Sequence, residues 1–189
     1  MPRLFILVTG MPGSGKSIVV EVAREMGLPV YNMGDVVREE VLKRFGEITP
    51  ELMVKVSQLL REEYGEDVVA LRTLDRVSRE QGHCIVVVDG VRSLREVEVF
   101  KNRGDVVIVA VHASPKTRFE RLLRRKRPGD PVNYEEFLKR DYTELGFGVG
   151  SVIALADYVI VNEGELSETR EVARRVLSEV VMSRGRDCR

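Results

Sequence analysis

The feature that most constrains the fold is the glycine-rich stretch GMPGSGKS at residues 10–17. It matches the pattern G-x-x-x-x-G-K-[ST] at every required position. An apolar run at residues 4–8 precedes it, and apolar residues at helical spacing follow it as far as Gly27. Between a strand and a helix, such glycines let backbone N–H groups turn toward an anion at the helix N-terminus. The stretch therefore predicts a phosphate-binding loop.

The residue types of this loop predict individual roles. The Lys16 ammonium can reach the terminal phosphates of a nucleotide, and the Ser17 hydroxyl can bind Mg²⁺. An ordinary glycine turn before a helix is the alternative, but strand, loop and helix agree on the first interpretation. We expect the loop as a whole to bind nucleotide: Gly10, Met11, Pro12, Gly13, Ser14, Gly15, Lys16 and Ser17.

Composition limits the class of protein. A chain of 189 residues that is 43% apolar suits one domain, residues 1–189, with a full core. Lysine plus arginine equals aspartate plus glutamate at 30 each, so no overall positive charge favours nucleic-acid binding. Binding through a local cluster of arginines is still an alternative. No apolar run approaches membrane-spanning length, and the start of the chain leaves no room for a signal peptide. We therefore expect a cytoplasmic protein, of unspecified oligomeric state.

The two cysteines favour a reducing compartment. Cys84 falls in a predicted strand and Cys188 near the C-terminus. Two such residues make no metal-binding set, and a disulfide between them is the alternative that we do not favour. We expect Cys84 to be a small core residue and Cys188 a free thiol.

Apolar segments alternate with helical patterns along the rest of the chain. Further strands are predicted at residues 29–33, 84–89, 106–112 and 158–162. Thr49-Pro50 and Ser114-Pro115 mark helix starts near 50 and 115, and a last helix is expected over residues 167–183. The pattern predicts an α/β fold of three layers: a five-stranded parallel sheet with helices on both faces. A ligand then lies at the carboxyl ends of the strands.

Charged residues that follow two of these strands are candidates for the site. Asp89 ends a strand and could hold Mg²⁺ with Ser17, or simply form a turn. Asp35 and Arg38 lie one helical turn apart after the second strand, where they could face an acceptor or form a cap and a surface ion pair. Arg92 follows Asp89 and could bind an acceptor oxyanion or be a solvated arginine.

An arginine-rich segment could close over a transferring phosphoryl group. Its members are Arg118, Arg121, Arg124, Arg125 and Arg127. We expect Arg121 and Arg125, joined by Arg127, to act with Lys16 in catalysis, because several arginines stabilise the charge of the transition state and help exclude water. A solvated basic helix that touches RNA is the alternative. The Pro- and Gly-rich stretch 124–133 predicts a mobile loop within a lid at about 124–146, with its tip near 128–131.

The segment after the last strand lies at the same sheet edge as the loop. Asn162 and Gly164 could border the nucleotide base, although a simple turn is as good an interpretation. No Asn-Lys-x-Asp guanine signature occurs, which disfavours a GTPase.

These motifs together resemble the nucleoside-monophosphate-kinase group of P-loop proteins. GDVVR at 34–38 resembles the adenylate kinase acceptor segment, whose arginine grips the acceptor phosphate, and DGVR at 89–92 follows in the same order. The chain from RFERLLRRKR to ADYVIVNEG also resembles dephospho-coenzyme A kinase. Over nearly its full length, including DGVRSLREVEVF, it is similar to an archaeal family related to adenylate kinase. The lid stretch is shorter than a zinc-type lid, and DGVR differs from the adenylate kinase segment, so AMP is not implied as acceptor.

The resemblance implies an ATP- and Mg²⁺-dependent phosphotransferase with a nucleotide or nucleotide-like acceptor. Helices over residues 35–82 would form the acceptor side. Two alternatives stay open at this point. The acceptor could be the ribose hydroxyl of dephospho-coenzyme A, for which Asp35 would orient or deprotonate the hydroxyl. The protein could instead be an ATP-dependent switch or assembly factor that acts through a protein or RNA partner.

Overall fold

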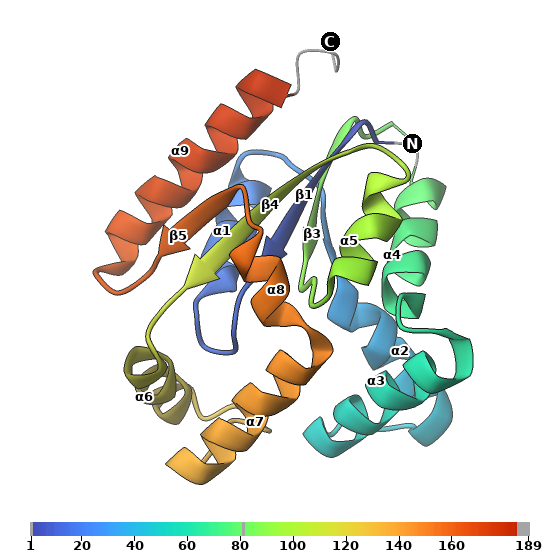
Figure 1. Cartoon of the computed structure of the whole chain (residues 1–189), viewed down its shortest axis with the longest axis vertical. Coiled ribbons are helices and arrows are strands. Elements are labelled where there is room, and N and C mark those ends of the chain that lie inside the picture. The colour runs from blue at the N-terminus through green and yellow to red at the C-terminus, as the bar shows by residue number, and fades with distance from the viewer. Residues whose placement is uncertain (1, 81, 185–189) are drawn as a thin grey trace.

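The computed structural model describes residues 2–80 and 82–184, in which strands and helices alternate around one sheet (Figure 1). The strands are β1 (Leu4–Thr9), β2 (Val30–Asn32), β3 (Ile85–Asp89), β4 (Asp105–His112) and β5 (Tyr158–Val161). The helices are α1 (Lys16–Glu25), α2 (Met33–Phe45), α3 (Pro50–Tyr64), α4 (Val68–Arg79), α5 (Leu94–Lys101), α6 (Pro115–Arg125), α7 (Tyr134–Phe147), α8 (Val149–Ala154) and α9 (Leu166–Arg184).

The five strands form one parallel sheet in the order β2-β3-β1-β4-β5. The strand before the glycine-rich loop, β1, is central, and it pairs with β3 on one side and β4 on the other. The chain first runs from β1 to β2 on one side and later crosses from β3 to β4 on the other side of β1. Open α/β sheets bind ligands at the carboxyl ends of the strands at such a switch point. The predicted five-stranded parallel sheet is confirmed.

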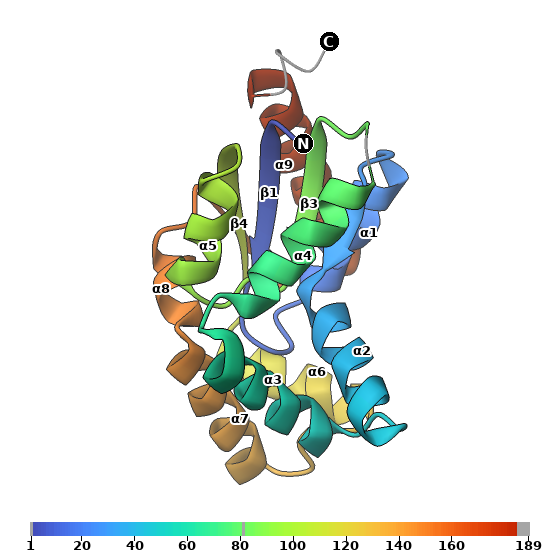
Figure 2. The same cartoon turned by 90° about the vertical axis from the view of Figure 1, so that its right-hand side faces the viewer.

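Two helical layers bury both faces of the sheet, which explains the uninterrupted apolar sequence of β1. Phe5 and Leu7 face a core built with α2, α3, α4, α5 and α8. Leu4, Ile6 and Val8 face a second core built with α1 and α9. Every residue of β1 is buried, as expected for a strand covered on both sides. Figures 1 and 2 show α9 and α1 on one side of the sheet and α4 and α5 on the other.

Two helical arms extend beyond the carboxyl ends of the strands. Figure 1 shows α2 and α3 forming one arm and α6 and α7 the other. The arms touch, because a Cβ added at Gly129, in the α6–α7 loop, would lie 2.5 Å from the Pro50 ring at the start of α3. The phosphate-binding loop, between β1 and α1, lies at this end of the sheet.

The helix starts follow the capping residues. Thr49 accepts a hydrogen bond from Leu52 N before Pro50, and Ser114 accepts one from Thr117 N before Pro115, so both predicted starts are confirmed. β2 is shorter than predicted because Asn32 caps α2 through the Gly34 N–H, which begins the helix at Met33. The other boundaries differ from prediction by one residue, at the ends where helices and strands fray.

The expectation for Cys84 is wrong. Cys84 is disulfide-bonded and not a free core thiol. It lies half-buried just before β3, at the amino end of the sheet and outside the packed interior that the strand pattern suggested. Cys188 lies outside the described residues.

Among residues 2–80 and 82–184, no helix combines the length and the apolar character needed to cross a bilayer.

A buried ion pair joins the arm helix α3 to the main domain. Arg61 donates to the Glu96 carboxylate at 3.0 Å, and Glu96 also accepts from the Arg92 N–H at 2.7 Å. The side chains of Arg61 and Glu96 are both under 10% exposed. Burial raises the pKa of Glu96, against the opposing effect of the Arg92 N–H and the Arg61 guanidinium. Such a pair is held in place by mutual satisfaction of charge and hydrogen bonds.

We expect Glu96→Ala to lower the free energy of unfolding by about 3–5 kcal/mol, because it leaves the buried Arg61 guanidinium without a carboxylate, and only neutral oxygens of Ser57 still accept hydrogen bonds from it. Guanidinium chloride denaturation measures this loss. Glu98→Ala is the matched control on the same helix, where Glu98 is exposed beside Lys101, and we expect it to change stability by less than about 0.5 kcal/mol. Equal losses in the two variants would contradict the role of the buried pair.

Candidate active site

The loop at residues 10–17 adopts a conformation that only glycine allows at three positions. Gly10, Gly13 and Gly15 have φ of 148°, 80° and 98°, in the left-handed region. The backbone also runs against its neighbours there. A Cβ at Gly10 would overlap the Val111 carbonyl oxygen, and one at Gly15 would overlap the Asn162 amide. The loop is therefore packed into a fixed shape.

Lys16 begins α1 and folds back over the loop. Its Nζ donates to the carbonyl oxygens of Gly10 at 2.6 Å and Met11 at 3.3 Å. Desolvation lowers the pKa of Lys16 to about 8, while Asp89 and then Glu144 oppose this shift electrostatically. The ammonium thus lies at the helix N-terminus, where backbone N–H groups already favour an anion.

Asp89 lies at the carboxyl end of β3, beside the loop. Its Oδ2 accepts a hydrogen bond from Asn32 Nδ2 at 2.7 Å, and Asn32 also caps α2. Burial raises the pKa of Asp89, and the nearby Lys16 and Arg92 act in the opposite direction. The sequence analysis did not predict Asn32 as a site residue, although its position at the carboxyl end of a strand indicates one.

Three buried polar atoms lack a partner in the described part of the chain: Ser14 Oγ, Asp89 Oδ1 and Arg121 Nη1. All three belong to the surroundings of the loop. Ser14 is in it, Asp89 lies beside Lys16, and Arg121 contacts the asparagine that holds Ser14. Because an unpaired buried polar group is costly, atoms of this kind indicate a site that a ligand completes.

Asn162 holds the loop through its side chain. Its Nδ2 donates to the Ser14 carbonyl oxygen at 2.8 Å, and its Oδ1 accepts from Thr169 Oγ1 at 2.9 Å and from Arg121 at 3.3 Å. The structure therefore places Asn162 beneath the loop, whereas the sequence predicted only that its backbone borders the base. Gly164 is exposed two residues further on.

The arginines of α6 have different roles. Arg121 points to the loop through Asn162, but Arg118 is buried and makes a two-point contact with Asp141 at 2.8 and 2.6 Å. Arg118 also donates to the Pro12 carbonyl oxygen at 3.2 Å, so it ties the loop to α7. The idea that Arg118 closes over a phosphoryl group is therefore corrected. Arg124 is exposed and pairs with Glu120 on the helix surface.

Arg125 is held by the lid loop. Its Nε and Nη2 donate to Asp130 at 2.8 and 2.5 Å, and the Arg127 N–H donates to the same carboxylate. Arg140 of α7 donates to Gly129 O and Asp130. Partial burial would raise the pKa of Asp130, but these arginines outweigh it and lower the pKa to about 2. Arg140 also acts electrostatically on Lys16.

The predicted acceptor residues lie in two places: Asp35 and Arg38 on α2 of the opposite arm, and Arg92 in the loop between β3 and α5. Asp35 and Arg38 form an ion pair on the first turn of α2, and Asp35 is near enough to Asp89 to raise its pKa electrostatically. Arg92 pairs with Glu144 of α7 at 2.9 Å and lies 6.0 Å from the centre of the Phe147 ring. Glu144 and Arg140 were missed, although their spacing of four residues on α7 would have placed both on one helix face.

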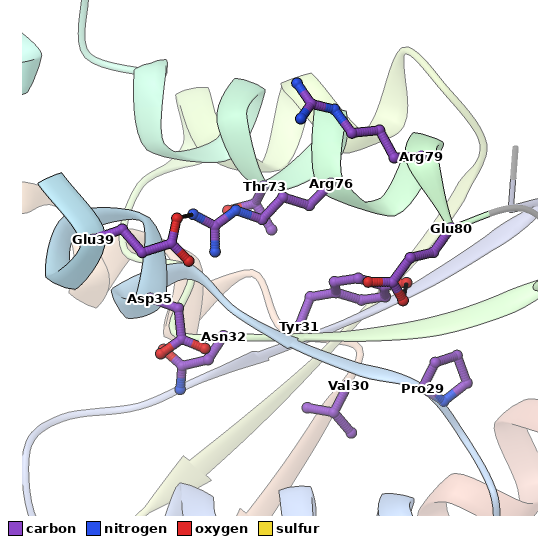
Figure 3. A pocket seen from close by; sticks show the side chains of 10 residues that line it. All are labelled: Pro29, Val30, Tyr31, Asn32, Asp35, Glu39, Thr73, Arg76, Arg79 and Glu80. Atoms are coloured by element: carbon purple, nitrogen blue, oxygen red, sulfur yellow. Dashed lines mark hydrogen bonds and ion pairs between the residues drawn. The ribbon is translucent and has the colours of Figure 1, made fainter.

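A cavity of about 620 Å³ lies beside this region, along β2 between α2 and α4. It shares Asn32 and Asp35 with the predicted acceptor side but contains no residue of the phosphate-binding loop. Figure 3 shows Arg76 reaching to Glu39 and Tyr31 beside Glu80 in its walls. These groups pair with one another. The cavity therefore adjoins the predicted acceptor side through Asn32 and Asp35 without reaching the phosphate-binding loop.

The lowered pKa of Lys16 predicts that affinity for Mg·ATP falls as pH rises through about 8. Below that pH the ammonium is charged and attracts phosphate, and above it the neutral amine does not. Calorimetry should show a loss of about tenfold between about pH 7 and 9. Lys16→Ala should bind weakly and without this pH dependence. A wild-type affinity that is flat over the same range would contradict the assignment.

Comparison with protein families agrees with this geometry. A family model described as an AAA domain matches residues 9–139. A UPF0200 protein from Staphylothermus marinus is 56% identical over 187 residues, which cover 99% of this chain and 98% of that protein. A UPF0200 protein from Hyperthermus butylicus is 60% identical over 178 residues, which cover 94% of this chain and 95% of that protein.

Solved structures share the architecture at low sequence identity. TT1252 from Thermus thermophilus has a TM-score of 0.65 at 22% identity, and the match covers 95% of this chain and 99% of that one. Shikimate kinase from Bacteroides thetaiotaomicron has a TM-score of 0.61 at 18% identity, with 93% and 98% covered. These likenesses show a P-loop kinase fold. The full-length matches to archaeal proteins show that the chain belongs to the UPF0200 protein family.

Proposed function

We propose that the protein is an ATP-dependent phosphotransferase that moves the γ-phosphate of ATP to a nucleotide or nucleotide-like small molecule. The observation that carries this proposal is the set of three unpartnered buried atoms around the glycine loop, on Ser14, Asp89 and Arg121. They come from three separate segments: Ser14 is in the loop, Asp89 acts electrostatically on Lys16, and Arg121 contacts the Asn162 side chain that holds Ser14. A carboxylate, a hydroxyl and a guanidinium in this arrangement suit a magnesium-bound polyphosphate.

The donor half would hold ATP. Lys16 and the loop N–H groups bind the β- and γ-phosphates, and Arg121 and Arg125, joined by Arg140, approach the transferring group. The Ser17 hydroxyl is exposed and one Asp89 carboxylate oxygen is unpartnered, so these two residues fit Mg²⁺. When bound, Mg²⁺ would bridge phosphate oxygens and neutralise developing charge.

The acceptor half would lie between the arms. Arg38 and Arg92 orient the acceptor, and Asp35, on the first turn of α2, is the candidate base for a reacting hydroxyl. Shikimate kinases share this fold, and one was solved in complex with shikimate, which supports an acceptor of small-molecule size. An ATP-dependent switch that acts through a macromolecular partner is the competing function, and the acceptor test below separates the two.

Closure of the lid would exclude water, which competes with the acceptor as a nucleophile. The described contact between Gly129 and Pro50 joins the lid loop to the acceptor arm. On the lid side of this contact, Arg140 donates to the Gly129 carbonyl oxygen, and the Asp130 carboxylate accepts from the Arg127 N–H. The contact therefore supports a lid at residues 124–146 that seals against α3.

Two substitutions separate donor from acceptor binding. Lys16→Ala should abolish phosphoryl transfer and weaken Mg·ATP binding, because it removes the cation at the terminal phosphates. Arg38→Ala should spare ATP affinity within about threefold and reduce acceptor use by at least about tenfold. Labelled ATP with a broad acceptor panel, together with calorimetry, measures both. Equal loss of ATP affinity in the two variants, or ATP turnover that no acceptor changes, would contradict the proposal.

Gly129→Ala should increase ATP hydrolysis in the absence of acceptor. The new methyl group would meet the Pro50 ring, and the backbone φ of 81° disfavours alanine. The lid would then close incompletely and admit water. Gly146→Ala is the matched control, because a Cβ at this α7 position meets nothing within 4 Å. A hydrolysis rate for Gly129→Ala that equals the control rate would rule out this seal.

A further inference from the structure

We infer that the acceptor presents an uncharged hydroxyl, and not a phosphate, to ATP, and that Glu144 enforces this choice. The inference rests on the proposed function and narrows it to one class of reacting group. Its basis is a difference in charge pairing between the two halves of the site, within the described residues. Beside the glycine loop, Lys16 and Arg121 make no carboxylate contact among these residues, and Arg125 and Arg140 share one carboxylate, Asp130, in the lid. On the acceptor side, Arg38 and Arg92 each pair with a carboxylate of their own.

The two cations that lie against the glycine loop, Lys16 and Arg121, remain available for an anion. Lys16 donates only to the backbone carbonyl oxygens of Gly10 and Met11 among the described hydrogen bonds. Arg121 contacts the neutral amide of Asn162, and its Nη1 has no partner in the described part of the chain. A polyphosphate can therefore bind these groups without displacing a carboxylate.

In the acceptor half, carboxylates already balance the positive charges of the arginines. Arg92 pairs with Glu144 at 2.9 Å, Arg38 pairs with Asp35, and Arg61 behind them pairs with buried Glu96. Three arginines thus face three carboxylates. A phosphate dianion that binds here has to approach these carboxylates or displace them, and either course opposes its binding.

Glu144 is placed to act on both halves. Its side chain is only 17% exposed, so water screens its charge poorly. It contacts Arg92, and its charge also reaches Lys16, where it opposes the fall in pKa. Phe147, three residues further along α7, lies against the same guanidinium. The carboxylate therefore forms part of the wall between acceptor and donor, where it repels an anion and can accept a hydrogen bond from a hydroxyl.

A hydroxyl acceptor also gives Asp35 a function. The hydroxyl oxygen forms a bond to the γ-phosphorus, the bond from that phosphorus to the β-phosphate oxygen breaks, and ADP leaves. Asp35 accepts the hydroxyl proton and passes it to solvent, since its side chain is 48% exposed. A phosphate acceptor is already ionised and needs no such base.

The product identifies the reacting group directly. The wild-type protein is incubated with Mg·ATP and a panel that contains nucleosides, sugars and hydroxy acids on one side and nucleoside monophosphates on the other. Phosphorus NMR should show new phosphomonoesters. New phosphoanhydrides from the monophosphates would overturn the inference and leave the proposed phosphotransferase intact. Hydrolysis of ATP with no transfer to any compound would overturn both.

Glu144→Gln tests the selecting residue without a known acceptor. With the nucleotide site filled by Mg²⁺ and a non-hydrolysable ATP analogue, inorganic phosphate should bind the variant at least about tenfold more tightly than the wild type. Glu171→Gln, an exposed change on α9, should leave phosphate binding unchanged. Weaker phosphate binding in Glu144→Gln would mean that Glu144 orients Arg92 toward a phosphate, and that result, or no change, would overturn the inference.

Discussion

The structure depends on how closely other segments approach the backbone of the glycine loop. Gly10 lies against the carbonyl of Val111 in β4, Gly13 against the Arg118 backbone in α6, and Gly15 against Asn162 after β5. Each approach requires the absence of a Cβ. The sheet and two later segments therefore fix the loop before a ligand arrives, and its N–H groups need little rearrangement to meet phosphate.

Packing around this loop also organises the rest of the site. Arg118 connects Pro12 to Asp141 of α7, and α7 in turn carries Arg140 and Glu144 to the two halves of the cleft. One helix thus contributes to the lid, the donor side and the acceptor side. A change in its position would alter all three, which is how lid closure and acceptor choice can be linked in one short chain.

Sequence patterns predicted the parts of the fold that local chemistry controls. The five strands, the loop and the helix starts at Pro50 and Pro115 follow from apolar runs, glycines and caps. The roles of site residues beyond the loop could not be predicted in this way, because the sequence does not distinguish one arginine of a helix from another. Only the tertiary contact with Asp141 shows that Arg118 is structural, and only the packing of α7 brings Glu144 to Arg92. Likewise, nothing local indicated that Cys84 is disulfide-bonded.

Amide hydrogen exchange of residues 13–17, with and without Mg·ATP, tests the central claim most directly. The account predicts that ATP binding slows exchange of these loop amides more than exchange elsewhere in the sheet or helices, because their N–H groups would donate to phosphate oxygens. Nucleotide binding that leaves these amides unprotected, or a well-folded protein that binds no Mg·ATP, would contradict it.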